Sequence, residues 1–285
     1  MYSVYSFDRK DLSLMPKRTA ESNKGSYGKL LCVCGSSGMC GAAYLAAKAA
    51  YRTGAGLVRI LTHKDNLIPL QASLPEAIVT VYDPCDMDFN LIADVLEWAD
   101  TAVIGCGLGN SAESRALLSY VLRNFTKSKI LDADALNIIS ANPTLKKYLN
   151  NSIITPHPLE MHRLTGIELS EILEKPNEVA YNFAKKYETV CVLKLHRTVV
   201  SDGGERIYVN QSGNDGMATA GSGDVLAGIL GGILAQNKLC ELSLTDVAAL
   251  GVYVHGLAGD AAAEELGRYS LMASDIINAL PKVLR

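Results

Sequence analysis

The sequence has no large excess of charge of either sign and no long hydrophobic run. Its 27 Lys and Arg residues nearly balance its 30 Asp and Glu residues, which leaves a formal net charge of −3. A chain this close to neutrality has no electrostatic basis for binding nucleic acid or an anionic membrane. The longest stretch with little charge, residues 225–237, is interrupted by glycine and is too short to cross a bilayer. Residues 1–29 also lack an apolar core of signal-peptide length, so we expect a cytoplasmic protein.

Cysteine is present, but in no pattern typical of a metal site or a disulfide framework. There are seven cysteines, an odd number, and none form a C-x-x-C pair. Cys32 and Cys34 lie in an apolar run, where the alternation of a strand puts both side chains on one face. We therefore expect free, buried thiols rather than metal ligands or disulfides.

Several catalytic motifs are also absent. The chain contains no G-x-x-x-x-G-K-[ST] segment, which excludes a Walker A site, and no H-E-x-x-H motif or serine-hydrolase elbow. The glycines of residues 105–109 resemble a dinucleotide-binding loop, but they lack the G-x-G-x-x-G spacing and lie in the middle of the chain. The sequence therefore disfavours a Rossmann-type dehydrogenase.

What the chain does contain is a repeated order of apolar strand, glycine turn and helix. This order predicts an α/β fold with a mostly parallel sheet and helices on both faces, and Asp202-Gly203-Gly204 predicts a hairpin with a small antiparallel addition. No linker interrupts the pattern, so we expect one domain over residues 1–285. The predicted strands are 29–34, 57–61, 77–81, 101–106, 129–131, 152–155, 189–195, 198–201 and 206–209; the predicted helices are 42–51, 89–99, 112–125, 177–187, 224–236, 245–266 and 274–280, the last limited by Pro281.

Polar and glycine-rich segments follow five of the predicted strands. Ligands of open α/β sheets bind beyond the carboxyl ends of the strands, so we expect these segments to line one cleft. The five segments are residues 35–41, 105–110, 132–137, 156–160 and 194–198.

The most informative segment is the glycine-rich loop over residues 213–224, which runs directly into an apolar helix. Small residues allow backbone N–H groups to approach an anion, and the positive end of the helix points to the same place. Gly221, Ser222 and Gly223 are therefore candidates for an anion hole. Asp224 stands beside them, where a phosphate would repel it, which suggests a catalytic base; the alternative is that Asp224 only caps the helix.

Other side chains have a functional and a structural interpretation. Asp132 and Asp134 could hold Mg²⁺ through water, or form a strand-end turn with one cap. His157, between two prolines, could point into the cleft or have a structural role, and Lys194 could meet a phosphate or be a solvated lysine. For His255, in a helix of small residues, we favour packing.

Taken together, six segments resemble the ADP- or ATP-dependent NAD(P)H-hydrate dehydratases, a ribokinase-like family. The resemblance covers roughly residue 16 to the C-terminus, and the segments occur in the family's order. The last of them is shared in part with other ribokinase-like enzymes, whereas its combination with 131–137 and 155–160 is more specific. The six segments are residues 24–29, 35–43, 54–58, 131–137, 155–160 and 213–224.

This resemblance implies an enzyme that repairs hydrated nicotinamide cofactors, a carbon–oxygen lyase. In that family a nucleotide, here expected to be ADP rather than ATP, phosphorylates the C6 hydroxyl of the hydrated ring. The ring nitrogen then expels phosphate, which restores NADH or NADPH and leaves AMP. The substrate would be the S epimer, with a separate NAD(P)H-hydrate epimerase acting on the other. Mg²⁺ is implied as the counter-ion of the phosphates, and a homotetramer as the assembly.

The resemblance also implies roles for individual residues. Asp224 would be the base. Ala42, Gly107, His157 and Asp224 would line the site of the hydrated cofactor, and the nucleotide would contact Lys194, Leu195, His196, Arg197, Thr198 and Gly223. Leu195 stands where the family commonly has glycine, and no metal ligands are assigned. Two alternatives remain: a kinase of the same fold, acting on a hydroxymethyl pyrimidine, thiazole or sugar, and a non-catalytic nucleotide sensor.

Overall fold

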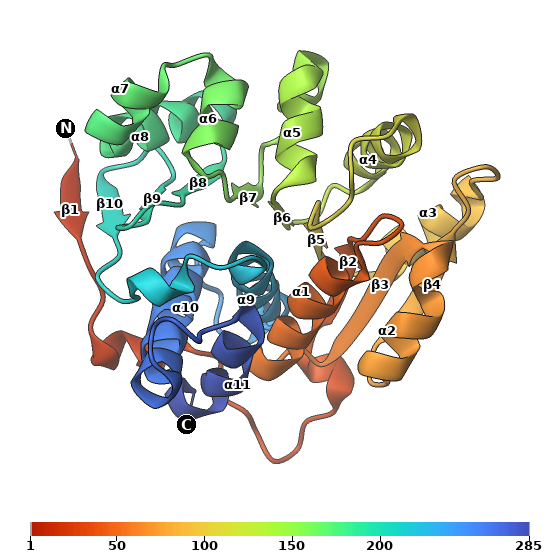
Figure 1. Ribbon diagram of the computed structural model, residues 1–285, viewed down its shortest axis with the longest axis horizontal. Coiled ribbons are helices and arrows are strands. Elements are labelled where there is room, and N and C mark those ends of the chain that lie inside the picture. Colours follow the sequence, from red (N-terminus) through yellow and green to blue (C-terminus); the bar gives the residue numbers. More distant parts are fainter. Residues whose placement is uncertain (1, 285) are drawn as a thin grey trace.

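The computed structural model describes residues 2–284, whose strands form one ten-stranded sheet (Figure 1). The strand order is β1-β10-β9-β8-β7-β6-β5-β2-β3-β4. The seven strands β8-β7-β6-β5-β2-β3-β4, in their spatial order, are all parallel to one another, and β9 is antiparallel to both of its neighbours. The strands are β1 Ser3–Tyr5, β2 Lys29–Val33, β3 Leu57–His63, β4 Ile78–Tyr82, β5 Thr101–Ile104, β6 Lys129–Leu131, β7 Ser152–Ile154, β8 Val190–Leu193, β9 Val199–Ser201 and β10 Arg206–Val209.

Helices cover both faces of this sheet. They are α1 Cys40–Thr53, α2 Leu67–Ser73, α3 Phe89–Trp98, α4 Ala112–Asn124, α5 Asp134–Ala141, α6 Pro158–Thr165, α7 Leu169–Glu174, α8 Pro176–Tyr187, α9 Ser222–Ala235, α10 Leu244–Leu266 and α11 Ala273–Val283. Short 3₁₀ helices lie at Arg9–Leu14, Lys24–Tyr27, Lys64–Asn66, Pro143–Tyr148, Asp215–Met217 and Asn237–Leu239. No helix in residues 2–284 is long and apolar enough to span a bilayer.

Two hydrophobic cores lie on the two faces of the sheet. Helices α1, α2, α9, α10 and α11 form one core, and α3 to α8 form the other, as the two rows of helices in Figure 1 show. Strand β2 contributes to both, because Cys32 points to the first core and Leu31 and Val33 point to the second. Burial on both faces explains why the parallel strands read as continuous apolar runs.

The predicted α/β sheet and its antiparallel addition are therefore confirmed, and so is the shared face of Cys32 and Cys34. All seven cysteines are free, but Cys85 is exposed and Cys40 and Cys240 are only partly buried, so burial holds for four of them.

Some elements of the fold were not predicted from the sequence, and several boundaries differ from the predicted ones. Helices α2, α5, α6 and α7 and strand β1 were not predicted. These helices are shorter than the window of roughly 11–18 residues over which helical spacing is recognised, and β1 is shorter than the strands that alternation identifies. Pro281 does not limit the last helix, since α11 continues through it to Val283. The buried side chains of Ile277 and Leu280 hold that turn against the core, which outweighs the missing N–H of the proline.

Helix α9, which follows the glycine-rich loop, packs very closely on α1. A Cβ atom at Gly228 would lie 2.2 Å from the carbonyl oxygen of Ala46, and one at Gly232 would lie 2.7 Å from that of Ala50. Only glycine allows this approach of the two backbones. The first turn of α9 is thereby fixed at the carboxyl end of the parallel strands.

Candidate functional site

The segments that follow the parallel strands are hydrogen-bonded to one another, as the sequence analysis expected of a common cleft. The Gly35 N–H donates to the Cys106 carbonyl at 2.9 Å, which joins the ends of β2 and β5. The Lys194 N–H donates to the Pro156 carbonyl at 2.8 Å, which joins the ends of β8 and β7. One continuous edge of polar loops therefore lies beyond the strands.

The glycine-rich loop is held over this edge by a carboxylate of α10. Asp260 accepts the backbone N–H of Gly213 at 2.8 Å and the side-chain amide of Asn214 at 2.9 Å. Asn214 in turn accepts the N–H of Gly216 and begins the 3₁₀ helix Asp215–Met217. Asp260 carries no pattern that the sequence analysis could have used, because its partners are more than forty residues away.

The turn from this loop into α9 requires glycine. Gly221 has a φ of +87°, in the left-handed region, and precedes Ser222, the first residue of the helix. Within residues 2–284 no side chain caps this helix end, so N–H groups of its first turn are available to an anion. Asp224 is the third residue of the helix and does not cap it, so the structural alternative for Asp224 is wrong.

The Asp224 carboxyl group lies close to a second acid and a thiol. One oxygen of Asp224, one oxygen of Asp132 and the Cys106 sulfur lie within 4.8 Å of one another. Burial raises the pKa of Asp224 to about 6 and the charge of Asp132 adds to this, while Cys106 and Lys194 act in the opposite direction. Asp224 is therefore a carboxylate at neutral pH with a greater proton affinity than an exposed aspartate.

Asp132 lies at the end of β6 and is paired with Lys194. Its Oδ1 accepts the Thr155 hydroxyl at 2.6 Å and the Lys194 ammonium at 2.8 Å. The Lys194 Nζ also lies 3.8 Å from Glu160 Oε2. Burial alone would lower the pKa of Lys194, but the two carboxylates outweigh it and raise that pKa. Lys194 is thus a fixed cation inside the site and not a solvated lysine.

His157 begins helix α6. Its Nδ1 accepts hydrogen bonds from the backbone N–H groups of Leu159 at 3.2 Å and Glu160 at 3.3 Å. The His157 N–H in turn donates to the Glu160 carboxylate at 2.8 Å. Burial, followed by the charge of Lys194, lowers the pKa of the imidazole. A neutral ring with Nδ1 as acceptor carries its proton on Nε2, so His157 has a structural role and still faces the cleft.

A cavity of about 640 Å³ opens between the loop over 213–218 and the ends of β7 and β8. It contains seven of the site residues expected from the sequence: His157, Lys194, Leu195, His196, Thr198, Ser222 and Gly223. The other lining residues are Asn210, Ser212, Gly213, Asn214, Asp215, Met217, Ala218, Leu226, Val252, His255 and Gly256. Arg197 is exposed and does not line this cavity.

His255 is one lining residue whose place the sequence analysis misjudged. The side chain is only partly buried, and its Nε2 lies 3.3 Å from the Ser222 hydroxyl at the wall of the cavity. Burial lowers the pKa of His255 to about 4, so the ring is neutral. Its spacing within an apolar helix gave no sign of this contact.

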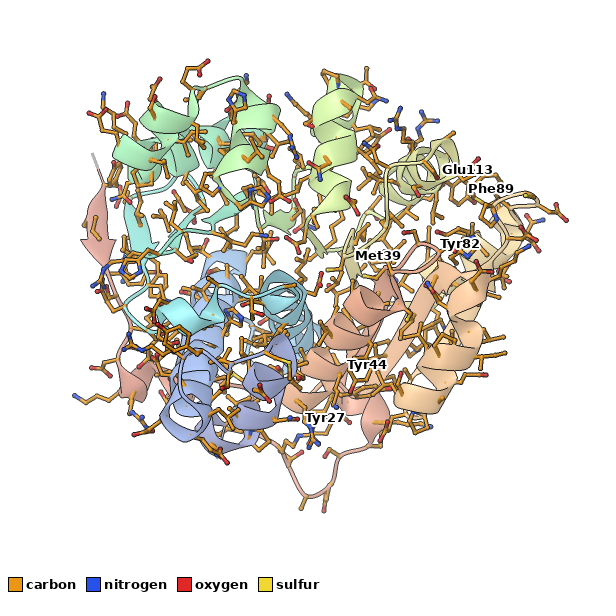
Figure 2. The ribbon with its side chains drawn as sticks, viewed as in Figure 1. Tyr27, Met39, Tyr44, Tyr82, Phe89 and Glu113 are labelled. Carbon is orange, nitrogen blue, oxygen red and sulfur yellow. The ribbon has the colours of Figure 1, made fainter. Side chains whose placement is uncertain are left out.

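Ala42 and Gly107 lie against each other. A Cβ atom at Gly107 would lie 2.7 Å from the Cβ of Ala42 and 3.2 Å from that of Met39. Figure 2 shows Met39 in the loop that leads into α1, with Tyr44 further along that helix. Gly107 follows Cys106, whose sulfur lies within 4.8 Å of an Asp224 carboxyl oxygen, so this pair of residues lies near Asp224. Of the expected site residues, Ala42, Gly107, Gly221 and Asp224 do not line the cavity, although Asp224 is the next residue after the lining residue Gly223.

Comparison with known proteins gives one consistent result. A family model described as NAD(P)H-hydrate dehydratase matches residues 30–282. The chain is 38% identical over 283 residues to the bifunctional NAD(P)H-hydrate repair enzyme Nnr of Escherichia coli, covering 99% of this chain and 52% of the relative. It is 37% identical over 268 residues to the ADP-dependent (S)-NAD(P)H-hydrate dehydratase of Neisseria meningitidis, covering 92% of this chain and 86% of that relative. The chain thus spans about half the length of the bifunctional relatives.

Solved structures agree with this result. An ADP/ATP-dependent NAD(P)H-hydrate dehydratase from Bacillus subtilis, co-crystallised with ATP/Mg²⁺, superposes with a TM-score of 0.81 at 29% identity, covering 97% of this chain and 96% of that one. A hydroxyethylthiazole kinase from Pyrococcus horikoshii superposes with a TM-score of 0.62 at 15% identity over 91% and 89% of the two chains. At that identity the second likeness concerns the ribokinase-like fold alone.

Proposed function

Because the chain belongs to the NAD(P)H-hydrate dehydratase family, we propose that it restores hydrated NADH and NADPH to the reduced cofactors. The reaction would be the ADP-dependent dehydration of the S epimer, with AMP and phosphate as products, which makes the protein a carbon–oxygen lyase. The observation that carries this proposal is the position of Asp224. A carboxylate with a pKa of about 6 stands in the first turn of a helix whose free N–H groups can receive a phosphoryl group.

In this proposal Asp224 takes the proton from the C6 hydroxyl of the hydrated ring as that oxygen attacks the β-phosphorus of ADP. The N–H groups of the Gly221–Gly223 turn stabilise the charge on the transferring phosphoryl group. The C6–O bond then breaks as the ring nitrogen donates its electron pair, and phosphate leaves. Loss of a proton from C5 restores the C5=C6 double bond.

We propose that the nucleotide occupies the cavity. Lys194, Leu195, His196, Thr198 and Gly223 line it, which supports the contacts that the resemblance implied. Leu195, which replaces the usual glycine, adds apolar surface to the wall. The expected contact of Arg197 has no such support, because that side chain is exposed outside the cavity.

The hydrated nicotinamide would lie beside Asp224, near Ala42 and Gly107. His157 faces the cavity, so it would lie where the two substrates meet. An in-line transfer requires the C6 oxygen, the phosphorus and the leaving oxygen of the nucleotide to lie along one line, with the Asp224 carboxylate beside the hydroxyl that it deprotonates.

The cluster of Cys106, Asp132 and Asp224 does not fit a resident Mg²⁺. Magnesium prefers oxygen ligands and retains water, whereas this cluster contains a buried thiol and Asp132 is already paired with the Lys194 ammonium. We therefore propose that Mg²⁺ enters as the counter-ion of the nucleotide phosphates, and we derive no step from the protein cluster.

The remaining expectations are also part of this proposal. We propose one domain over residues 1–285, a cytoplasmic location and a homotetrameric assembly, which light scattering of the purified protein would test. An NAD(P)H-hydrate epimerase acting on the R epimer would supply further substrate. Relatives named as repair enzymes favour this function over phosphorylation of a hydroxymethyl pyrimidine, thiazole or sugar.

The test is to incubate the protein with hydrated NADH, Mg²⁺ and either ADP or ATP, and to follow the absorbance of NADH together with inorganic phosphate. We expect both to increase in equal amounts, faster with ADP. A stable phosphate ester without recovery of NADH would assign the kinase alternative. Nucleotide binding without any product would assign the sensor alternative.

A further inference from the structure

Beneath Gly223 lies a group of buried charges that the reaction steps above do not use. The Asp132 carboxylate is 1% exposed and its Oδ1 receives two donors, the Thr155 hydroxyl and the Lys194 ammonium. Glu160, also buried, lies on the other side of that ammonium. Burial of the two carboxylates is costly unless they are paired, and both lie beside the partly buried Lys194 ammonium.

We infer that Asp132 is a positioning residue of the proposed reaction, which holds the Lys194 ammonium under Gly223 where the phosphoryl group is transferred. The inference rests on the proposed function, because it concerns the same site. Asp132 itself does not line the cavity, whereas Lys194 and Gly223 do. Asp132 therefore acts through Lys194 and not by contact with the nucleotide.

The position of Gly223 supports this role. A Cβ atom at Gly223 would lie 3.6 Å from the Lys194 Nζ and 4.0 Å from Asp132 Oδ2. The ammonium is thus adjacent to the N–H groups that begin α9. A phosphoryl oxygen bound by those groups would also be within reach of Lys194, since an ammonium has three donors and Asp132 Oδ1 takes one.

The bonds of Asp132 explain how Lys194 is held. Thr155 fixes the orientation of the carboxylate from the end of β7, and Asp132 Oδ1 then fixes the ammonium. Glu160 is fixed by the His157 N–H and adds a second attraction at 3.8 Å. A flexible lysine side chain is restricted in this way to one position before the nucleotide binds.

The two carboxyl oxygens of Asp132 face different partners. Oδ2 lies 3.7 Å from the Cys106 sulfur, on the side of Asp224. The negative charge of Asp132 contributes to the raised pKa of Asp224, so its removal would lower that pKa. The charged and titratable groups that face Asp224 come from five places in the chain: Cys34, Cys106, Asp132, Asp134 and Lys194.

The test uses Asp132→Asn, which keeps the shape and removes the charge, in the assay with hydrated NADH and ADP. We expect kcat to fall about 100-fold, because a misplaced group near the reacting atoms has effects of that size. The rising limb of the pH profile of kcat should move to lower pH. This shift reports the lost charge of Asp132 near Asp224, so the role through Lys194 requires the double-mutant cycle with Lys194→Met.

Thr155→Val removes only the hydroxyl that holds the Asp132 carboxylate, and it serves as the test if Asp132→Asn does not fold. It should lower kcat in the same direction by a smaller factor. The matched control is Thr101→Val, which removes a buried hydroxyl from the start of β5, where it donates to the Ser128 carbonyl at 2.7 Å, far from the site. Thr101→Val should leave kcat unchanged.

A double-mutant cycle with Lys194→Met tests whether Asp132 acts through Lys194. At a pH well above the pKa of Asp224, Asp132→Asn should add little to the loss of kcat already caused by Lys194→Met. If Asp132→Asn lowers kcat by the same factor in the Lys194→Met background as in the wild type, the inference is overturned. An Asp132→Asn protein with the kcat and pH profile of the wild type would also overturn it.

The affinity for ADP, measured by calorimetry, separates this inference from the proposed function. Asp132→Asn should weaken ADP binding, and the effect should vanish in the Lys194→Met background. These effects on ADP affinity are expected even if the wild-type protein does not restore NADH. Such a failure to restore NADH would reject the proposed function only. Unchanged ADP affinity in Asp132→Asn and Lys194→Met, with normal turnover by both, would reject the positioning role only.

Discussion

The carboxyl groups of Asp132 and Asp224 face each other beside the Cys106 sulfur, but their environments differ. Asp132 accepts hydrogen bonds from an ammonium and a hydroxyl. Asp224 has no such ion pair within residues 2–284, and burial raises its pKa to about 6. The two neighbouring acids therefore differ in their partners, and Asp224 is the one suited to exchange a proton.

The first prediction concerns the pH dependence of the reaction. Asp224 accepts a proton only when it is ionised, so kcat should increase with pH through about 6 and then reach a plateau. The measurement is the rate of NADH recovery from hydrated NADH at saturating ADP across this range. A rate that is constant from acid to neutral pH would argue against Asp224 as the base.

The second prediction is that Asp224→Asn keeps substrate binding and loses turnover. Removal of a general base typically lowers kcat by about 10²–10⁴-fold. The ADP affinity should remain, because the N–H groups at the start of α9 do not depend on this side chain. Calorimetry with ADP and single-turnover kinetics check the two parts. Wild-type turnover by Asp224→Asn would contradict the assignment.

The third prediction is that the same variant is more stable than the wild type above pH 6. A carboxyl group with a raised pKa in the folded state binds its proton more tightly there than when unfolded. Folding stability therefore falls as pH rises from about 3.8 to about 6. Asparagine carries no such penalty, so Asp224→Asn should gain up to about 3 kcal/mol at neutral pH. Urea unfolding at acid and neutral pH should show a difference that disappears below pH 3.8.

The fourth prediction separates the two roles of His157. His157→Ala removes the acceptor at the start of α6 and should cost about 0.5–2 kcal/mol of stability. His157→Asn keeps an acceptor at a good capping residue and should be nearly as stable as the wild type. Both should raise the KM for the hydrated cofactor. An increase in the KM for ADP alone would show that His157 contacts the nucleotide instead.

The fifth prediction compares two glycines of the anion-binding turn. Gly221→Ala should lose about 1–2 kcal/mol of stability, because its φ of +87° is unfavourable for alanine. Gly223→Ala lies in the helix, where a Cβ has ordinary room beside Lys194, so the fold should be as stable or slightly more stable.

Gly223→Ala should nevertheless weaken ADP binding, since the added methyl group stands between the phosphates and the N–H groups at the start of α9. Thermal unfolding and ADP titration of the two variants check this contrast. A destabilised Gly223→Ala with normal ADP affinity would contradict it.

Much of the fold and part of the site could be predicted from the sequence because they depend on local patterns. Continuous apolar runs such as β2 and β5 indicate strands buried on both faces, and the polar segments after them then fall on one edge. The loop ending at Asp224 was recognisable for the same reason, since its glycines and its apolar helix are contiguous in the chain.

The parts of the fold and site that the sequence did not predict depend on contacts between residues far apart in the chain. Strand β1 pairs with β10 about two hundred positions later, and Lys194 meets Asp132 across 62 positions. No local pattern reports such pairs. His157 was ambiguous because the two prolines that flank it are compatible with a rigid turn or a helix start.

The glycine contacts between α9 and α1 have a consequence for how this site can change. The spacing of the two helices is set by main-chain atoms, which cannot repack by adopting another rotamer. Helix α9 is therefore a poor place to introduce variation, because almost any larger side chain at Gly228 or Gly232 forces the helices apart. Libraries that aim to alter nucleotide choice should be directed at lining residues of the cavity outside that interface, such as Leu195, His196, Thr198, Asn210 and Met217.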